Sequence, residues 1–272
     1  MRFIQHKKEA YWFYRALSPL YDRWVNPLFW TAEMRSAALE LARLDDARLR
    51  TLDAGAGTGF STEGIVEQVE ASCVTLLDQS PDQLRRASRK PSLAACRRVL
   101  GDAERLPFDA DTFDRYVSCG SVEYWPDAPR AIAEAYRVVR PGGIAVVVGP
   151  LPPANRLARL LADVWMLFPT EAEYREWFER AGFESLEIAK LAAPWQPDGE
   201  RRYGLAIGGT KPAAAAAPAV AAPPSERRDE RLTLRRGARL AARLALGSLA
   251  GAAFIPVGVA LNLRARLARR RP

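Results

Sequence analysis

Histidine and cysteine are scarce in this chain of 272 residues. His6 is the single histidine, and the three cysteines, Cys73, Cys96 and Cys119, are an odd number without a CxxC pair. A zinc site or another histidine-based metal centre needs several such ligands at short spacings, so we expect no metal. A disulfide framework is also not expected, and the chain suits a reducing compartment.

The first residues, 1–8, read MRFIQHKK and lack the continuous apolar stretch of a secretory signal. The net charge is +8, and much of the excess of Lys and Arg lies in the last third of the chain. No basic stripe interleaved with aromatic residues is present, which argues against a nucleic-acid partner. The charge is better explained by an anionic membrane surface.

Between residues 50 and 210 the chain alternates short apolar runs with amphipathic ones. Such alternation is typical of βαβ units, and predicts an α/β fold with a Rossmann-like, seven-stranded, mostly parallel sheet. We expect the last two strands to join as an antiparallel pair. The strands are expected at 50–54, 73–78, 97–100, 113–118, 143–149, 183–190 and 203–209, and the helices between them at 61–69, 81–89, 128–139 and 170–180.

Four regions follow from these patterns. Residues 1–45 form an N-terminal helical lid, with an aromatic-rich helix at 9–25 and a second helix at 31–43 that Thr31 caps. Residues 46–210 form the sheet domain. Residues 211–230 are dominated by Ala and Pro and predict a linker. Residues 231–272 form a basic tail.

The tail contains a run without charge at 244–263, flanked on both sides by arginines. Twenty helical residues span about 30 Å, the thickness of a bilayer's hydrocarbon core. We therefore expect a C-terminal membrane-associated helix, with a transmembrane span as the leading interpretation. The alternative is an interfacial helix that lies on anionic lipid. The nearly symmetric arginines leave the orientation open.

The segment from Thr51 to Gly59 reads TLDAGAGTG and leads from a strand into a helix. Its Gly55-x-Gly57-x-Gly59 spacing is tighter than the GxGxxG fingerprint of nicotinamide enzymes. Asp53 precedes the glycines, where a carboxylate would repel a pyrophosphate but suit an ammonium group, directly or through water. A cationic ligand is therefore favoured over a dinucleotide.

Further polar residues follow the next predicted strands. Asp78 and Gln79 end the second strand, where an Asp accepts the two hydroxyls of a ribose. Asp102 and Ala103 follow the third strand, where a carboxylate would take an adenine amino group. Each acid taken singly has a plain structural explanation, as a cap of the following turn or an ordinary loop acid. Together with the glycine loop they predict a nucleoside site.

Several runs resemble class I methyltransferases that use S-adenosyl-L-methionine (SAM), and within them the 2-methyl-6-phytyl-1,4-benzoquinol / 2-methyl-6-solanesyl-1,4-benzoquinol methyltransferases of tocopherol and plastoquinone synthesis. The glycine loop points only to the superfamily, whereas the N-terminal run and the run around Trp165 are far more specific. The resemblance covers Arg2 to about Gly209. The runs that carry it are RFIQHKKEA (2–10), WFYR (12–15), LDQSP (77–81), GDAE (101–104), DRYVS (114–118), EYWPD (123–127), EAYRV (134–138) and DVWMLFP (163–169).

This resemblance implies a SAM-dependent C-methyltransferase that methylates the ring of a prenylated benzoquinol. Ser118 and Cys119 would line the methionine end of the cofactor. The candidates for the general base are His6, Glu123 and Tyr124, with Asp163 as a further possibility. Their alternatives are a surface histidine, packing of Glu123 and Tyr124, and helix polarity at Asp163. The aromatic residues near both ends of the domain suit a lipid entrance, although core packing explains them as well.

Other functions stay open at this point. The enzyme would otherwise methylate another membrane lipid such as demethylmenaquinol, or the chain would be a non-catalytic SAM-binding scaffold at the membrane. Plant members of the family carry a transit peptide and residues 1–8 do not resemble one. We therefore expect a membrane-associated protein whose catalytic domain is cytoplasmic in a bacterium, or a processed protein at a plastid-type membrane.

Overall fold

The computed structural model describes residues 30–153, 159, 167–192, 203–213 and 260. Its core is one seven-stranded sheet with the strand order β3-β2-β1-β4-β5-β7-β6. Every pairing is parallel except those of β7, which runs antiparallel to β5 and β6. The predicted sheet and its antiparallel closure are therefore confirmed. The strands are β1 (Thr51–Ala54), β2 (Val74–Asp78), β3 (Arg97–Leu100), β4 (Phe113–Cys119), β5 (Val139–Pro150), β6 (Glu184–Leu191) and β7 (Gly204–Thr210).

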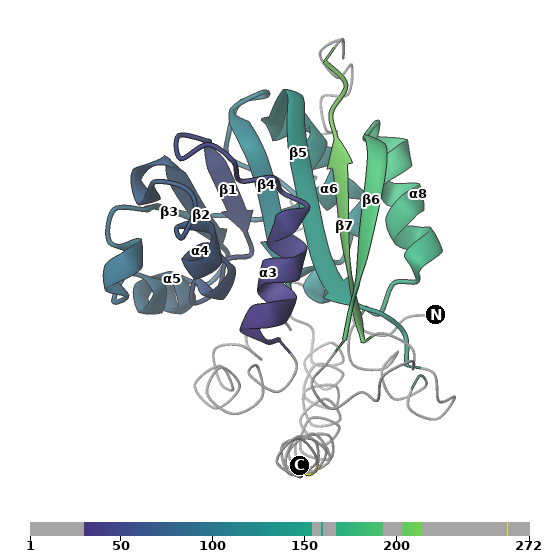
Figure 1. Ribbon diagram of the computed structural model, residues 1–272, viewed down its shortest axis with the longest axis horizontal. Helices are drawn as coiled ribbons and strands as arrows, with labels where there is room; N and C mark the ends of the chain where they lie inside the picture. Colours follow the sequence, from purple (N-terminus) through teal and green to yellow (C-terminus); the bar gives the residue numbers. More distant parts are fainter. Residues whose placement is uncertain (1–29, 154–158, 160–166, 193–202, 214–259, 261–272) are drawn as a thin grey trace, which may run out of the picture.

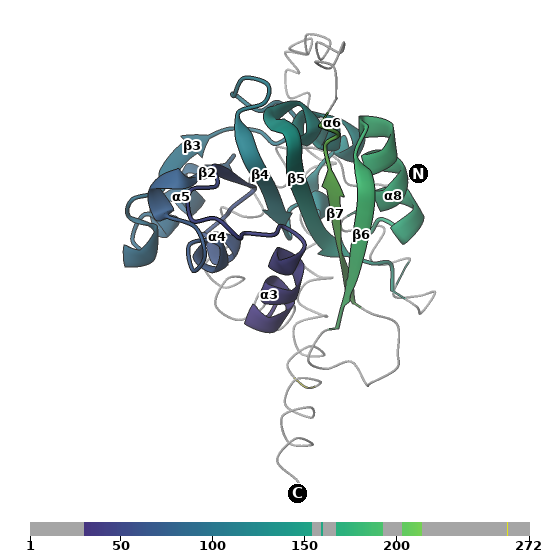
Figure 2. The ribbon, with the colours of Figure 1, turned by 45° about the horizontal axis from the view of Figure 1, so that its top comes forward.

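Helices cover both faces of the sheet, which gives three layers (Figure 1 and Figure 2). One face carries α3 (Ala32–Glu40), α4 (Phe60–Ile65) and α5 (Pro81–Ala87), and the other carries α6 (Ala128–Val138) and α8 (Glu171–Ala181). Short 3₁₀ turns complete the connections: η2 (Ala71–Cys73), η3 (Pro91–Leu93) and η4 (Val122–Tyr124).

The central strands are continuous apolar runs because both of their faces are buried. In β5, Ala145 and Val147 face the core under α6 and α8, whereas Val146 and Val148 face the core under α3 and α4. This alternation, with a period of two residues, divides the sheet's apolar side chains between two cores. The sheet is therefore a rigid base for the loops that leave its strand ends.

Side-chain caps fix where the helices begin. The hydroxyl of Thr31 accepts a hydrogen bond from Met34 N at 3.2 Å, as the sequence predicted. Thr170 and Glu173 form a reciprocal capping box at the start of α8. Gly182 ends that helix in a left-handed conformation, with φ of +101°. Such caps satisfy backbone groups that a helix end leaves without partners.

Residues 30–45 of the predicted lid belong to the helical layer over the sheet. Met34, Ala38 and Leu39 of α3 are buried against it. The guanidinium of Arg115 in β4 donates to the carbonyl oxygens of Ala42 at 2.6 Å and Arg43 at 3.1 Å. The helix that follows Thr31 is shorter than expected and ends at Glu40.

The predicted linker and tail lie almost wholly outside the described residues, as do the expected helix at 9–25 and most of 151–168. Within the described ranges, no helix is long and apolar enough to cross a bilayer. Of the expected span at 244–263, only Ala260 is described.

Candidate functional site

A cleft opens at the carboxyl ends of β1, β2, β3 and β4, where the strand order reverses between β1 and β4. Ligands of α/β sheets bind at this kind of switch point. The cleft and its open mouth enclose about 1270 Å³. Its wall includes Trp30, Met34, Arg35, Gly55, Gly57, Phe60, Asp78, Gln79, Gln83, Asp102, Ala103, Glu104, Cys119, Glu123, Tyr124, Trp125 and Val148.

The glycine loop forms the floor of the cleft. The amide groups of Gly55 and Ala56 both donate to the carbonyl oxygen of Leu77, at 2.8 and 3.0 Å, so the loop folds back over the end of β2. Gly57 has φ of +55°. A Cβ atom there would meet no protein atom within 4 Å and would point into open space. A ligand can therefore approach the backbone closely at this point.

Gly59, the third glycine of the predicted cofactor loop, lies apart from the other two. It does not line the cleft but stands at the start of α4, with φ of +83°. A Cβ atom there would come within 2.4 Å of Leu93 Cδ1. Its lack of a side chain therefore serves the packing of α4 rather than contact with a ligand.

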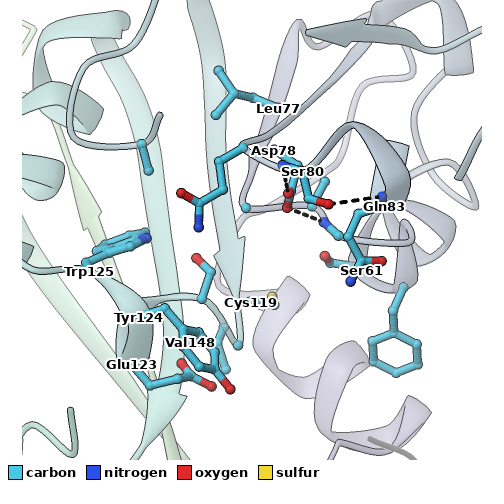
Figure 3. Close-up of a pocket in the computed structure, with 18 of the residues that line it drawn as sticks. Ser61, Leu77, Asp78, Ser80, Gln83, Cys119, Glu123, Tyr124, Trp125 and Val148 are labelled. Carbon is cyan, nitrogen blue, oxygen red and sulfur yellow. Dashed lines mark hydrogen bonds between the residues drawn. The ribbon is translucent and has the colours of Figure 1, made fainter. Parts of the chain in front are cut away.

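Asp78 ties the glycine loop to the end of β2 (Figure 3). One carboxylate oxygen accepts from Gly57 N at 2.9 Å and the other from Ser80 N at 2.8 Å. A carboxylate oxygen can accept more than one hydrogen bond, so this group can also accept hydrogen bonds from a ligand. Gln79 lines the cleft beside it.

Asp102 and Ala103 lie on the same wall, directly after β3. Asp102 accepts from Glu104 N at 3.0 Å, which folds the chain into a turn there. Gly101 N donates to Asp78 O at 3.0 Å and holds the ends of β2 and β3 together. The acids of two successive strands are thus brought into one cleft.

Asp53 lies behind the glycine loop, and not on the cleft wall as a direct ligand contact would require. Its side chain is fully buried, and it accepts from Ser61 Oγ at 2.9 Å and Thr62 Oγ1 at 2.6 Å. Burial raises its pKa to about 6, against the effect of these two hydrogen bonds. Its visible role is to hold the start of α4, because those hydroxyls belong to the first turn of that helix.

Ser118 is also buried behind the wall. Its hydroxyl donates to Ala54 O at 2.7 Å and shares a 2.7 Å hydrogen bond with Ser121 Oγ. Cys119, the next residue, does line the cleft. Burial raises the pKa of its thiol, so the group stays neutral and acts as a small side chain.

Glu123 and Tyr124 lie at the end of the cleft farther from Asp78, with Cys119 between them and it (Figure 3). They belong to η4, directly after β4. Glu123 is only 6% exposed, and burial raises its pKa to about 8. Within the described part of the chain, its Oε2 atom has no hydrogen-bond partner. The other predicted base candidates, His6 and Asp163, lie outside the described residues.

Helices α3 and α4 also contribute to the wall, and no local sequence pattern indicated this. Met34 and Arg35 come from the first turn of α3, Trp30 lies just before that helix, and Phe60 begins α4. Arg35 donates to Phe60 O at 3.0 Å, and its guanidinium lies 5.1 Å from the Phe60 ring centre. The only sequence feature that pointed to this contribution was the position of the capped helix just before the first strand.

The wall's charge decides which ligands suit the cleft. It carries the carboxyl groups of Asp78, Asp102 and Glu104 and the guanidinium of Arg35, and the raised pKa of Glu123 keeps that acid mostly neutral. An excess of acids opposes a dianionic pyrophosphate and favours a cation with hydroxyl and amino donors. SAM has this character.

Comparisons with known proteins agree with this geometry. A family model described as "Methyltransferase domain" matches residues 52–147. The chain is 49% identical over 262 residues to the chloroplastic 2-methyl-6-phytyl-1,4-hydroquinone methyltransferase of Arabidopsis thaliana, covering 95% of this chain and 77% of that one. It is 56% identical over 207 residues to a rice protein of the same name, numbered 2, covering 76% of this chain and 59% of the rice protein.

Among solved structures, phosphoethanolamine N-methyltransferase 2 of Haemonchus contortus, in complex with SAM, aligns with a TM-score of 0.57. The sequence identity is 14%, and the alignment covers 66% of this chain and 53% of that one. At this identity the likeness shows the fold alone. The extended identity to the plant enzymes shows the family. The chain therefore belongs to the 2-methyl-6-phytyl-1,4-hydroquinone methyltransferase family, and is a class I methyltransferase that uses SAM as its methyl donor.

Proposed function

We propose that this protein transfers the methyl group of SAM to a ring carbon of a prenylated hydroquinone of the 2-methyl-6-phytyl or 2-methyl-6-solanesyl type. The observation that carries this proposal is the 49% identity to the Arabidopsis enzyme over 95% of the chain. The acid-lined cleft supports it, because the cofactor is a cation and the second substrate is a neutral ring. The reaction belongs to tocopherol and plastoquinone-like synthesis.

For the cofactor, we propose that Asp78 accepts the ribose hydroxyls beside Gln79, and that Asp102 and Ala103 receive the adenine. Gly55, Gly57 and Cys119 would face the methionine end. Asp53, Gly59 and Ser118 would act from behind the wall, by holding α4 and the loop in place. These roles follow from which groups line the cleft and from the donors and acceptors that each offers.

The ring must be made nucleophilic before it can accept a methyl group. A phenol with a pKa near 10 is only about 0.1% ionised at pH 7, so forming the phenolate costs about 4 kcal/mol. SAM supplies an electrophilic methyl group on a good leaving group. The chain's tasks are to orient the ring, to exclude water with apolar side chains such as Trp125 and Val148, and to take up a proton.

We further propose that the enzyme works at a membrane that holds prenylquinols. The uncharged run at 244–263 and its flanking arginines support a C-terminal anchor after the Ala/Pro linker. A tether raises the effective concentration of a bilayer-bound substrate at the cleft. The plant relatives are chloroplastic, which favours a plastid-type or photosynthetic membrane. In this proposal residues 1–45 cover the cleft and 46–210 form the catalytic domain.

The test is a substrate panel with radiolabelled SAM and the full chain. The panel holds 2-methyl-6-phytyl-1,4-hydroquinone, its solanesyl counterpart and demethylmenaquinol, each in mixed micelles. We expect kcat/KM to be highest for one of the first two. A clear preference for demethylmenaquinol would indicate that the enzyme acts in the synthesis of another quinone. Tight SAM binding without turnover on any quinol would instead indicate a scaffold.

A further inference from the structure

We propose that Glu123 is the group that takes the proton from the substrate hydroxyl, and that it becomes a carboxylate when the cationic methyl donor enters the cleft. The first half of this inference rests on the proposed function, because it needs a hydroxyl-bearing ring. The second half needs only the cofactor, and can be tested without any quinol.

The placement of Glu123 is the first reason. It lines the cleft from η4, while Asp78 lies at the other end of the same wall (Figure 3). Asp102 follows Gly101, whose amide group donates to Asp78 O. If the adenosine part is held by those two acids, the end near Glu123 remains for the reacting groups. The backbone there is fixed, because Glu123 O accepts from Leu167 N at 3.0 Å and Trp125 N donates to Val122 O at 3.1 Å.

The state of the side chain is the second reason. Glu123 is buried, yet its Oε2 atom has no hydrogen-bond partner within the described residues. A buried polar atom without a partner destabilises the fold unless a ligand or another group satisfies it. The carboxyl groups of the buried acids Glu104 and Glu134 have no such unpartnered buried oxygen, and they accept from Asp127 N and Leu106 N respectively.

The electrostatic surroundings agree with this reading. Burial raises the pKa of Glu123 to about 8. At pH 7 the carboxyl group is therefore protonated in most molecules whose cleft is empty. Two titratable groups face Glu123: Cys119 at the end of β4 and Tyr174 on α8. A negative charge on Glu123 raises the pKa of both, and both stay neutral. Tyr124 adjoins it on η4. On the α3 side of the cleft, the charge of Arg35 is shared with Glu67, whose carboxylate lies 3.1 Å away.

A positive charge within a few ångströms lowers a carboxyl pKa by about 1 to 3 units. Bound SAM would therefore lower the pKa of Glu123 toward or below 7 and release its proton. The carboxylate then accepts the hydroxyl proton of the ring. The activated ring carbon forms its bond to the methyl group, and the electrons of the broken S–C bond stay on sulfur. The ring carbon finally loses its own hydrogen to water, and the oxygen regains its proton from Glu123.

Calorimetry on the full chain tests the ionisation step. SAM and S-adenosylhomocysteine (SAH) are titrated at pH 7 in two buffers of different ionisation enthalpy, which gives the protons released by each. Both ligands carry the same α-amino group, so the difference between them reports the sulfonium charge alone. We expect SAM to release about 0.4 to 0.9 more protons per site than SAH. Glu123→Gln should abolish this difference, whereas Glu176→Gln, an exposed acid on α8, should retain it.

Kinetics test the proton transfer. We expect Glu123→Gln to lower kcat by about 10²- to 10⁴-fold with SAH affinity unchanged, and to remove the pH-dependent limb of kcat. Glu123→Asp should restore part of the rate, and Tyr124→Phe should keep the limb.

Equal proton release by SAM and SAH, or a difference that survives in Glu123→Gln, overturns the inference. So does a Glu123→Gln enzyme with wild-type kcat, or one whose only defect is weaker cofactor binding. If no quinol is methylated, the proposed function fails while the calorimetric difference still decides the state of Glu123.

Discussion

Asp78 connects the glycine loop to β2, and in our proposal it also accepts the ribose hydroxyls. We expect Asp78→Ala to weaken SAM binding by at least about 100-fold. Two charge-assisted hydrogen bonds of about 1.5–3 kcal/mol each are lost, and every 1.4 kcal/mol is a factor of ten. Isothermal calorimetry measures the change. The matched control is Asp82→Ala on α5, whose carboxylate pairs with the neighbouring Arg85. Equal affinity of both variants for SAM would show that Asp78 does not bind the cofactor.

Asp53 makes stability depend on pH. Its folded pKa of about 6 lies above the ordinary value of 3.8, so the folded state binds more protons than the unfolded state between these values. Stability from this group is therefore full below pH 3.8 and is lost as pH rises through about 6. We expect wild type to lose up to about 3 kcal/mol relative to Asp53→Asn across this window, from about 1.36 kcal/mol per pKa unit.

Urea unfolding of both proteins from pH 4 to 7 measures this difference. Glu123 has a raised pKa too, but it is present in both proteins and cancels in the comparison. Parallel stability curves for the two proteins would show that Asp53 does not carry the effect.

Among the secondary-structure elements, α8 packs on the face of the sheet opposite to α3 and α4. Thr170→Ala removes the hydroxyl half of its capping box, in which Thr170 Oγ1 accepts from Glu173 N, and keeps the hydrogen bond from Thr170 N to the Glu173 carboxylate. We expect a loss of about 1 kcal/mol in the free energy of unfolding, with SAM affinity unchanged. Glu176→Ala, on the exposed side of the same helix, should change stability by less than about 0.5 kcal/mol. A loss of SAM binding in Thr170→Ala would show that α8 is coupled to the cleft.

The elements themselves were largely predictable from sequence. Apolar runs with flanking turn residues located every strand, with bounds that differ by at most one residue except in β5, which begins earlier, at Val139. Thr31 indicated the start of a helix because capping is a local interaction. The strand-end acids Asp78 and Asp102 were also correctly placed in one cleft, since the ends of parallel strands meet at one edge.

The features of the site that could not be predicted depend on packing between segments far apart in the sequence. Whether a strand-end side chain faces the cleft or the layer behind it depends on the neighbouring helix, and the hydroxyls of α4 draw Asp53 behind the loop. Arg35 and Trp30 reach the cleft because α3 packs across the sheet, which no local pattern reveals. The burial of Glu123 also depends on segments far away in the sequence. Leu167 N, for example, donates to the carbonyl oxygen of Glu123.

At the scale of the whole molecule, Lys211 is bound to the sheet domain through its side chain. Its ammonium group is 1% exposed and donates to Asp111 Oδ1 at 2.6 Å and to the carbonyl oxygens of Tyr136 and Val139 at 3.0 and 2.8 Å. A truncation should therefore retain Lys211 and stop after Ala213, the last residue described there.

We expect the 1–213 protein to bind SAM like the full chain and to leave the membrane fraction. Its kcat/KM should fall for a phytylated quinol in liposomes but not for a short-chain quinol in solution, because only the former depends on tethering. Sedimentation with liposomes and parallel assays provide the measurement. A truncated protein that still sediments with the liposomes would contradict a tail anchor.

The central claim is that the cleft at the strand ends directs the methyl group of SAM to a ring carbon of a prenylated hydroquinone. The most direct measurement is incubation of the full chain with trideuteromethyl-SAM and 2-methyl-6-phytyl-1,4-hydroquinone, followed by NMR and mass spectrometry of the product. The account predicts the label on a ring carbon, with Asp78→Ala inactive at low SAM concentration. A label on oxygen, or no labelled quinol while SAM is bound, would contradict it.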